Sequence, residues 1–413
     1  MYLKKYKTIG MLVVFLIICS NMCYAVDIPI WNQDTLLDSI TVSSNIESST
    51  SKEGNFLGLE SGSAILIEQK TGKVLYEHNI HEQLRPASVT KVMSLLLIME
   101  EIDKGKLSLT DNISCSENAS NMGGSQIWLD TTESLTVEEM LKAICVVSAN
   151  DCVMAMAEHI GGTEENFVSM MNEKAKSLGM KDTWFKNCHG IDEDGHVTSS
   201  YDISLMSKEL LNNYPEITKY TTIWMDSLRN GESELVNTNK LVRNYEGCTG
   251  LKTGSTSLAL FNLSASATRN DLSLIAVIMK APTSQIRFNE AQKLLDYGFN
   301  NFTYKQFGNK GEILKTINVS KGIEAQVEVV FENTAGVIIE KGKDKDIVQS
   351  INLDEVVQAP VLEGQKLGEM TFSLNGENVA SINLVAKSSV KKVNIFSMTG
   401  KILDDWFYML RKE

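Results

Sequence analysis

Three short groups of residues, far apart in the sequence, have the residue types needed for nucleophilic catalysis by a serine. They are Ser88–Lys91 (SVTK), Ser148–Asn150 (SAN) and Lys252–Gly254 (KTG). A capped helix, a helix end and a strand turn would account for each group separately, and SxxK alone occurs by chance in many chains. The three motifs in this order and at this spacing indicate serine acyl-enzyme chemistry.

The segment that follows Lys91 explains how a lysine can act as the base. Apolar residues occupy nearly every position of 92–99, so we expect a helix that is buried all round. Pro86 suits its first turn, and Ser88 and Lys91 lie one turn apart on the same face. No motif places a histidine–aspartate pair, so Lys91 is the residue in reach of the serine hydroxyl. Burial, the positive helix end and a second cation, Lys252, should lower the pKa of its amine.

The elements that must position these groups follow an α+β pattern over residues 56–303. The stretch SAILIEQKTGKVLYEHN predicts a hairpin around a KTGK turn. SLTVEEMLKAICVVSAND predicts a helix that begins with a Thr136/Glu139 capping box, and two amphipathic helices follow at 163–180 and 199–214. Strands beginning at GLKTGSTS and LSLIAVIMKA, and a closing helix over RFNEAQKLLDYGF, complete an α+β domain.

The composition changes after this domain. Short β-branched segments separated by Gly or Asn turns predict a small β-sandwich over 306–388, whose carboxylates we interpret as solvated.

Residues 391–413 predict an amphipathic helix with an aromatic face that includes Trp406 and Phe407. Such a helix can dock on its own β-domain or lie in a membrane interface, and its terminal position and aromatic content favour the membrane.

The amino terminus predicts export. Residues 1–25 combine three lysines, a short apolar run and a small-residue site ending at Ala25, which is typical of a signal peptide. Residues 26–55 are rich in Ser, Thr and Asn and predict a flexible leader. Removing the three lysines changes the formal charge from −13 to −16, which argues against nucleic acid as a partner. The length predicts two or three domains.

The cysteines and histidines give no sign of a metal or cofactor. Cys115, Cys145, Cys152, Cys188 and Cys248 are scattered and odd in number, so we interpret them as buried small hydrophobic residues. His189 and His196 bracket GIDEDG but lack a third ligand, and we expect them to make structural hydrogen bonds. We expect no metal and no cofactor.

The motifs resemble those of the serine-type D-Ala-D-Ala carboxypeptidases, the low-molecular-mass penicillin-binding proteins. The opening hairpin, GGSQIWL before SAN, FKNCHGIDEDGHVTSSYDI and the NTNKL…GLKTGST approach to KTG also resemble this family. The resemblance covers nearly everything after the leader. It implies a β-lactamase/transpeptidase-like catalytic domain, a small β-domain and a terminal helix that attaches the exported enzyme to the outer face of the cytoplasmic membrane. The implied partners are peptidoglycan stem peptides ending in D-Ala-D-Ala, and β-lactams as inhibitors.

The resemblance also assigns catalytic roles. Ser88 would form the acyl-enzyme with Lys91 as base, and Ser148 would relay a proton to the leaving D-alanine. Asn150 would hold Lys91 and the substrate amide. Water would then hydrolyse the acyl-enzyme.

A second group of residues would bind the substrate. Lys252 and Thr253 would bind the terminal carboxylate, the lysine as a point charge. The N–H group of Ser255, with that of the nucleophile, would form the oxyanion hole. A glycine entering a strand lets a substrate backbone come close, which is the expectation for Gly254. Arg287 is a further candidate partner of the carboxylate.

Three positions depart from the family pattern. Ala149 replaces a common glycine in SxN, Thr249 replaces a frequent acidic residue before GLKTG, and Ala259-Leu260 stands where an Ala-Gly pair is usual. The leucine would narrow the site or displace the strand that carries Lys252. These departures bear on turnover rate and substrate range.

Two other functions are weighed against the carboxypeptidase. A class A β-lactamase needs a deacylating glutamate midway between SxN and KTG. The nearest match, Glu234-Leu-Val-Asn237, lies only 18 residues before Lys252 and is therefore in the wrong place. A non-catalytic peptidoglycan-binding scaffold, suggested by Leu260, would not be labelled by a fluorescent penicillin.

Overall fold

The computed structural model describes residues 54–343 and 346–393. The predicted signal peptide, nearly all of the predicted leader and the predicted terminal helix from residue 394 onward lie outside these residues. Within the described ranges, no helix is both long enough and apolar enough to cross a bilayer.

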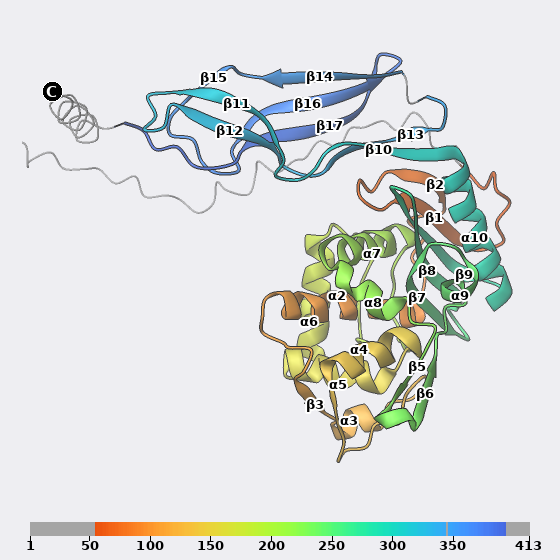
Figure 1. Ribbon diagram of the computed structural model, residues 1–413. Coiled ribbons are helices and arrows are strands. Elements are labelled where there is room, and N and C mark those ends of the chain that lie inside the picture. The colour runs from red at the N-terminus through yellow and green to blue at the C-terminus, as the bar shows by residue number, and fades with distance from the viewer. Residues whose placement is uncertain (1–53, 344–345, 394–413) are drawn as a thin grey trace, which may run out of the picture. The chain divides into compact units, whose positions relative to one another are not determined.

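A five-stranded antiparallel sheet forms the centre of the catalytic part, in the order β2-β1-β9-β8-β7 (Figure 1). The predicted hairpin is present as the first two strands, which pair directly. The first strand also pairs with β9, so the two ends of this domain meet in the middle of the sheet. The strands are β1 Ser63–Glu68, β2 Val74–His78, β7 Cys248–Thr256, β8 Leu260–Arg269 and β9 Leu272–Ala281.

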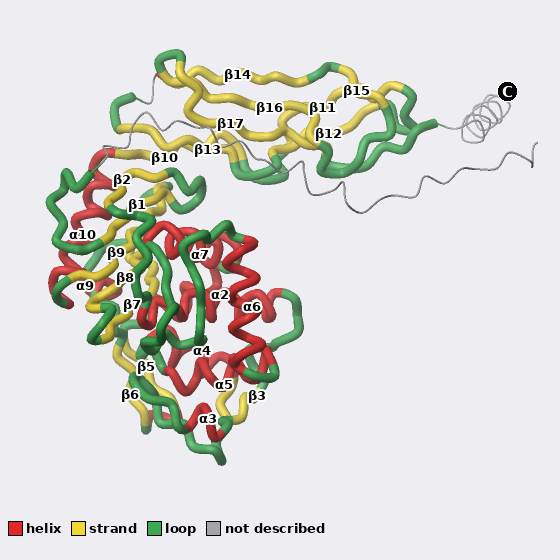
Figure 2. The backbone as a smooth tube through the Cα atoms, turned by 180° about the vertical axis from the view of Figure 1, so that it is seen from behind, coloured by secondary structure: helices red, strands yellow, loops and turns green. Residues whose placement is uncertain are grey.

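Alternation along β9 divides the apolar core between the two faces of this sheet. Leu274, Ala276 and Ile278 belong to a cluster shared with α10 (Ser284–Asn301). The intervening Ile275 and Val277 belong to the larger cluster, which is shared with the main block of helices. Successive strand residues point to opposite faces, so a strand that is apolar at every position is covered on both sides. Figure 2 shows the sheet between these helical layers.

The block of helices is built around α2 (Lys91–Asp103). Every residue from 91 to 99 is buried, which confirms the prediction of a helix without a solvent face. The remaining helices of this domain are η2 Ala87–Thr90, α3 Glu117–Ser120, α4 Val137–Val146, α5 Asn150–Gly161, α6 Glu164–Ser177, α7 Ser200–Asn213, η3 Pro215–Ile217, α8 Thr218–Thr221, η4 Arg229–Gly231 and α9 Leu241–Asn244. Two small hairpins pair β3 Asn112–Ser114 with β4 Ser134–Thr136, and β5 Met225–Leu228 with β6 Ser233–Val236.

The helix predicted over 134–151 is wrong in its extent. The capping box of Thr136 and Glu139 is present, but α4 ends at Val146 and α5 starts at Asn150. Ser148, between them, has φ +67°, a left-handed conformation in which an α-helix cannot continue. The break therefore places the serine of SAN outside both helices.

The β-rich part begins directly after α10. A six-stranded sheet has the order β14-β16-β17-β12-β11-β15, and β10 pairs with β13 in a second sheet. Residues from both sheets share one apolar cluster around Phe331, Val337 and Phe372. Six short segments that the sequence predicts as strands are present, namely EILKTINV, EAQVEVVFEN, AGVIIEKG, DIVQSINL, EMTFSL and ASINLVAK, whereas β10 and β15 are additional. The strands are β10 Phe302–Gly308, β11 Ile313–Ser320, β12 Gln326–Phe331, β13 Ala335–Glu340, β14 Ile347–Leu353, β15 Val356–Gln358, β16 Lys366–Leu374 and β17 Glu377–Ala386.

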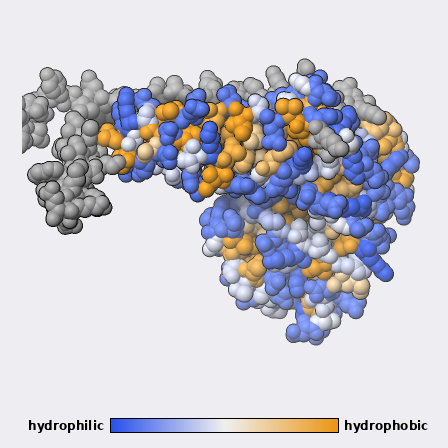
Figure 3. Space-filling view, turned by 45° about the horizontal axis from the view of Figure 1, so that its top comes forward, coloured by the Kyte–Doolittle hydropathy of each residue, from blue (hydrophilic) through white to orange (hydrophobic). Residues whose placement is uncertain are grey.

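Figure 3 shows apolar side chains in small patches among hydrophilic ones on the drawn face of the β-rich part. Val348, Ile351 and Val356 are each more than half exposed. Scattered apolar side chains are normal on a protein surface.

Candidate active site

The turn η2 runs directly into α2 and carries Ser88, the predicted nucleophile, so we call it the nucleophile turn. Ala87, immediately before the serine, has φ +48°, an uncommon conformation for a residue with a side chain. Two glycines let other elements approach this turn closely. A Cβ on Gly254 of β7 would lie 2.9 Å from the backbone nitrogens of Ser88 and Val89, and a Cβ on Gly190 would lie 2.9 Å from the Ser88 nitrogen. Neighbouring backbone segments therefore fix the position of the turn.

The expectation for Gly254 needs a correction. We expected the missing side chain to make room for a substrate backbone. The space that a Cβ would occupy is taken instead by the backbone of the nucleophile turn, including the Pro86 carbonyl oxygen at 2.9 Å. The glycine of KTG thus brings β7 against Ser88.

Lys91 is completely buried, and its amine has three polar partners. Its Nζ lies 2.6 Å from Asn150 Oδ1, 2.7 Å from the His189 carbonyl oxygen and 3.1 Å from Ser88 Oγ. Burial, and secondly the charge of Lys252, hold the pKa of Lys91 well below the ordinary lysine value. Both causes are among those that the sequence predicted.

The chemistry of the three partners determines where the lone pair of a neutral Lys91 amine points. The Asn150 amide is oriented by its own N–H donation to the Gly123 carbonyl oxygen at 2.6 Å, so Oδ1 faces Lys91. Asn150 Oδ1 and the His189 carbonyl can only accept hydrogen bonds, and they take the two hydrogens of a neutral amine. The lone pair is left facing Ser88 Oγ, the one partner that carries a proton. In its neutral form, Lys91 can therefore accept the serine proton in this geometry.

The loop GGSQIWL, residues 123–129, holds Asn150 on the side away from Lys91. Ser125 O accepts a hydrogen bond from the Asn150 backbone N–H at 2.7 Å, in addition to the side-chain contact with Gly123. The next residue, Asp151, is buried and accepts from the N–H groups of Ile127 and Leu129. The start of α5 and this loop therefore form one hydrogen-bonded unit at the site.

Ser148 is buried, and its Oγ has no hydrogen-bond partner among the described residues. A buried hydroxyl without a partner costs about 1–3 kcal/mol, and the left-handed backbone adds strain. Both costs are typical of functional positions. The unpaired hydroxyl is free to interact with a molecule that enters the site.

Lys252 and Thr253 lie on β7 and are both buried. Burial lowers the pKa of Lys252 to about 7, and the charge of Arg287 acts in the same direction. Its Nζ donates to the Thr253 carbonyl at 2.9 Å. Thr253 Oγ1 donates to Thr238 Oγ1 at 2.8 Å, whereas Ser255 is exposed. While it is charged, Lys252 lowers the pKa of the neighbouring Lys91 amine.

Arg287 is buried behind this strand. Its Nη1 donates to the backbone carbonyls of Gly254 at 3.1 Å and Asn262 at 3.2 Å, and burial lowers its pKa to about 10. Its Nε has no partner among the described residues. Arg287 thus supports β7 through backbone contacts, and its contact with a substrate carboxylate stays a prediction.

Leu260 does not displace the strand that carries Lys252. The ladder pairs Lys252 with Ser264 and Gly254 with Asn262 without a break, and ends at Thr256 opposite Leu260. Leu260 takes a left-handed φ of +56° at this end. Thr249 Oγ1 donates to Ser266 Oγ at 2.8 Å, so this replacement is accommodated within the sheet.

The segment FKNCHGIDEDGH contributes a group that side-chain reasoning missed, the His189 backbone carbonyl. The resemblance of the segment to the family was a signal of its importance, but not of which atom acts. His196 makes the expected structural hydrogen bonds, with Thr90 at 2.8 Å and with the Lys186 N–H at 3.0 Å. The five cysteines outside the signal are free, and all but Cys248 are buried, as expected. No metal-binding cluster occurs in the part of the chain that the structure describes.

Comparison with known proteins identifies the family of the chain. Residues 48–283 match the family described as D-alanyl-D-alanine carboxypeptidase, and residues 302–392 match the penicillin-binding protein 5 C-terminal domain. D-alanyl-D-alanine carboxypeptidase DacF of Bacillus subtilis (strain 168) is 41% identical over 359 residues, covering 86% of this chain and 92% of the relative.

Solved structures are similar as well. Penicillin binding protein 5 from Haemophilus influenzae has a TM-score of 0.72 and 30% identity, covering 81% of this chain and 98% of that chain. Penicillin-Binding Protein D2 from Listeria monocytogenes, in its ampicillin-bound form, has a TM-score of 0.54 and 29% identity, covering 59% of this chain and 99% of that chain.

The fold and the contact of Ser88 with the buried Lys91 thus define a serine hydrolase of the penicillin-binding type. The chain belongs to the D-alanyl-D-alanine carboxypeptidase family, with a penicillin-binding-protein-like catalytic domain followed by a β-rich C-terminal domain.

Proposed function

We propose that the protein removes the terminal D-alanine from peptidoglycan stem peptides, with Ser88 as nucleophile and Lys91 as general base. The observation that carries this proposal is the contact of the Lys91 amine with two fixed acceptors and with the Ser88 hydroxyl. Lys91 accepts the hydroxyl proton as Ser88 Oγ attacks the carbonyl carbon of the penultimate D-alanine. A tetrahedral intermediate with a negatively charged oxygen results.

The remaining site residues bind the substrate and this intermediate. The N–H groups of Ser88 and Ser255 stabilise the oxyanion, and Lys252 and Thr253 bind the terminal carboxylate. The unpartnered hydroxyl of Ser148 passes the proton from Lys91 to the nitrogen of the leaving D-alanine. The C–N bond breaks, D-alanine leaves and the shortened peptide is esterified to Ser88.

Water completes the turnover. Lys91, neutral again, accepts a proton from water as the water oxygen attacks the ester, and the proton returns to Ser88 Oγ when the C–O bond breaks. A β-lactam acylates the same hydroxyl by opening its ring. The tethered ring nitrogen does not diffuse away as D-alanine does, so such compounds inhibit the enzyme covalently.

The test is the release of free D-alanine from a synthetic peptide ending in D-Ala-D-Ala, with fluorescent penicillin labelling in parallel. Wild type should release D-alanine and become labelled. Ser88→Ala should do neither, because among the described residues no other hydroxyl is hydrogen-bonded to the Lys91 amine. Release of D-alanine by Ser88→Ala at the wild-type rate would refute the assignment of the nucleophile.

The location of the enzyme is part of the proposal. Residues 1–25 direct export, residues 56–303 form the catalytic domain, 306–388 form the β-domain, and 391–413 form an amphipathic helix that attaches to the outer face of the membrane. The aromatic and apolar half of that terminal segment supports this proposal. Deleting residues 391–413 should release the protein from membranes while activity on a soluble peptide remains. A truncated form that still sediments with membranes would contradict the anchor.

A further inference from the structure

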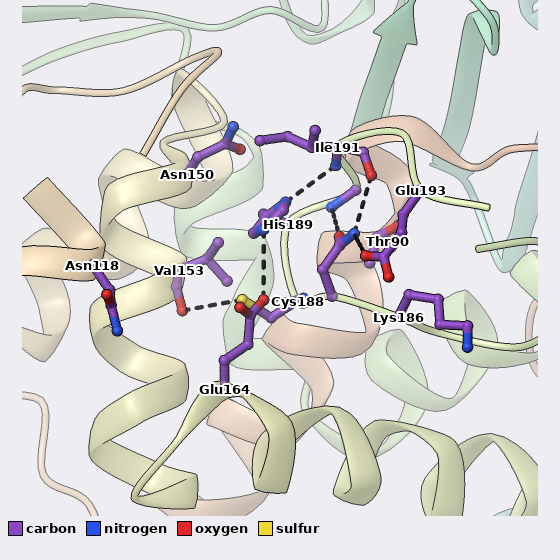
Figure 4. A network of polar contacts seen from close by, with 12 residues as sticks. Thr90, Asn118, Asn150, Val153, Glu164, Lys186, Cys188, His189, Ile191 and Glu193 are labelled. Atoms are coloured by element: carbon purple, nitrogen blue, oxygen red, sulfur yellow. Dashed lines mark hydrogen bonds and ion pairs between the residues drawn. The ribbon is translucent and has the colours of Figure 1, made fainter. Parts of the chain in front are cut away.

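The backbone carbonyl and the side-chain ring of His189 make different contacts in the site. Its backbone carbonyl accepts from Lys91 Nζ at 2.7 Å, and its ring lies buried next to α6. Ring Nδ1 accepts a hydrogen bond from the Ile191 N–H at 3.1 Å, so the ring proton of the neutral imidazole resides on Nε2. Nε2 in turn faces Glu164 Oε1 at 3.5 Å (Figure 4).

Glu164 is the first residue of α6, and its carboxylate contacts two successive residues of the loop. Oε1 accepts from the Cys188 N–H at 3.1 Å, besides facing the His189 ring. The side chain is only 26% exposed, and burial raises its pKa. A carboxylate taken partly out of water at this cost, on a helix anchored by the buried Phe167, is a rigid support for the loop.

Further contacts restrain the loop on both sides of the His189 carbonyl. Ser94 Oγ of α2 donates to the Cys188 carbonyl at 2.6 Å. The Gly190 N–H donates to Asn187 Oδ1 at 2.7 Å. The Gly190 N–H and the His189 carbonyl belong to one planar peptide group, so Asn187 restrains this carbonyl from one side. Glu164, through the Cys188 N–H and the His189 ring, restrains the same residue from the other side.

We propose that Glu164 and the His189 ring form a positioning pair that keeps the His189 carbonyl directed at Lys91. The pair thereby fixes the lone pair of the amine toward Ser88. Neither side chain contacts the nucleophile, so both act through Lys91. This inference rests on the proposed role of Lys91 as the general base.

The charged surroundings allow the pair to be tested through the titration of Lys91. Lys91 faces Lys252, Asp151 and Cys188. Glu164 faces Glu165 and Glu193, in addition to Cys188. The His189 ring faces Lys91 and His196, and burial together with these charges lowers its pKa to about 3, so it stays neutral at physiological pH.

The experiment measures Ser88 acylation by a β-lactam in Glu164→Ala, at saturating β-lactam and across pH. The plateau rate should fall about tenfold, less than the about 100-fold cost of a 1 Å misplacement. The apparent Kd of the β-lactam should change little, because the Lys252 end of the site is untouched. A weakened contact with the His189 carbonyl destabilises the ammonium form of Lys91, so the acid limb of the pH–rate profile should move to lower pH.

Glu165→Ala is the matched control, since Glu165 is the neighbouring residue on α6 and its side chain is exposed. It should leave both the rate and the acid limb unchanged. His189→Asn is a second variant, because its Oδ1 can still accept from the Ile191 N–H but nothing faces Glu164. It should reproduce both changes, and Glu164→Ala combined with His189→Asn should be no slower than the slower single variant.

Three results would overturn the pair. One is a Glu164→Ala profile identical to that of Glu165→Ala. Another is a slower plateau with an unmoved acid limb, which indicates general loosening of the fold. The third is a double variant whose loss equals the product of the single losses. If Glu164→Ala does not fold, His189→Asn alone decides. A wild type that never acylates would instead refute the proposed function.

Discussion

Replacing Gly190 by alanine should test whether the loop that packs against the nucleophile turn sets the position of Ser88. An alanine Cβ would lie 2.9 Å from the Ser88 nitrogen and overlap the Ala87 carbonyl oxygen. Restoring ordinary separation requires the turn or the loop to move by on the order of 1 Å. A movement of about 1 Å in a catalytic group costs about 100-fold in rate. We therefore expect Gly190→Ala to lower the rate constant of Ser88 acylation by about two orders of magnitude.

Gly195→Ala is the matched control in the same loop. Gly195 has φ +82°, close to the +91° of Gly190, so alanine meets similar backbone strain, about 1–2 kcal/mol. Its nearest neighbour is the flexible end of Lys186 at 3.4 Å, so no backbone has to move. Thermal denaturation should show the cost of backbone strain in both variants, with a further loss in Gly190→Ala from the overlap, and only Gly190→Ala should acylate slowly. Equal acylation rates would refute the account of how the turn is positioned.

Two further predictions concern Ser148 and Lys252. Ser148→Ala should slow D-alanine release. It should nevertheless raise the free energy of unfolding by about 1 kcal/mol, because it removes a buried hydroxyl without a partner among the described residues. A denaturant titration that shows a clear loss of stability would contradict this. The kcat/KM for a D-Ala-D-Ala peptide should fall as pH rises through about 7, because Lys252 is charged below its pKa and loses the charge above it. In Lys252→Arg this alkaline limb should move to higher pH even if the maximum rate is lower, and an unmoved limb would show that another group sets it.

Much of the catalytic set was predictable because it depends on side chains in ordered motifs. The apolar run after Lys91 predicted a buried amine, and burial is the main cause of its low pKa in the structure. Many strands of the two domains were also recognisable, because alternating or β-branched segments were separated by clear turns, whereas β10, β15 and the two small hairpins were not predicted.

Other features were not predictable because they depend on backbone geometry. The helix break at Ser148 arises from one left-handed residue, and SAND continues a helical pattern in the sequence. The His189 carbonyl is a main-chain group, which no residue type reveals. The sequence indicated that another backbone comes close to Gly254, but only the fold shows that this backbone is the nucleophile turn of the enzyme itself.

The central claim is that Lys91 is an uncharged amine when the enzyme reacts, and its own titration tests this most directly. Lysine Cε atoms labelled with ¹³C can be followed by NMR across pH, with Lys91 assigned by its absence in Lys91→Met. The account predicts that Lys91 titrates with a midpoint well below the ordinary lysine value. This midpoint should coincide with the acid limb of the pH–rate profile for Ser88 acylation. A Lys91 signal that stays in the charged form throughout the pH range in which Ser88 becomes acylated would contradict it.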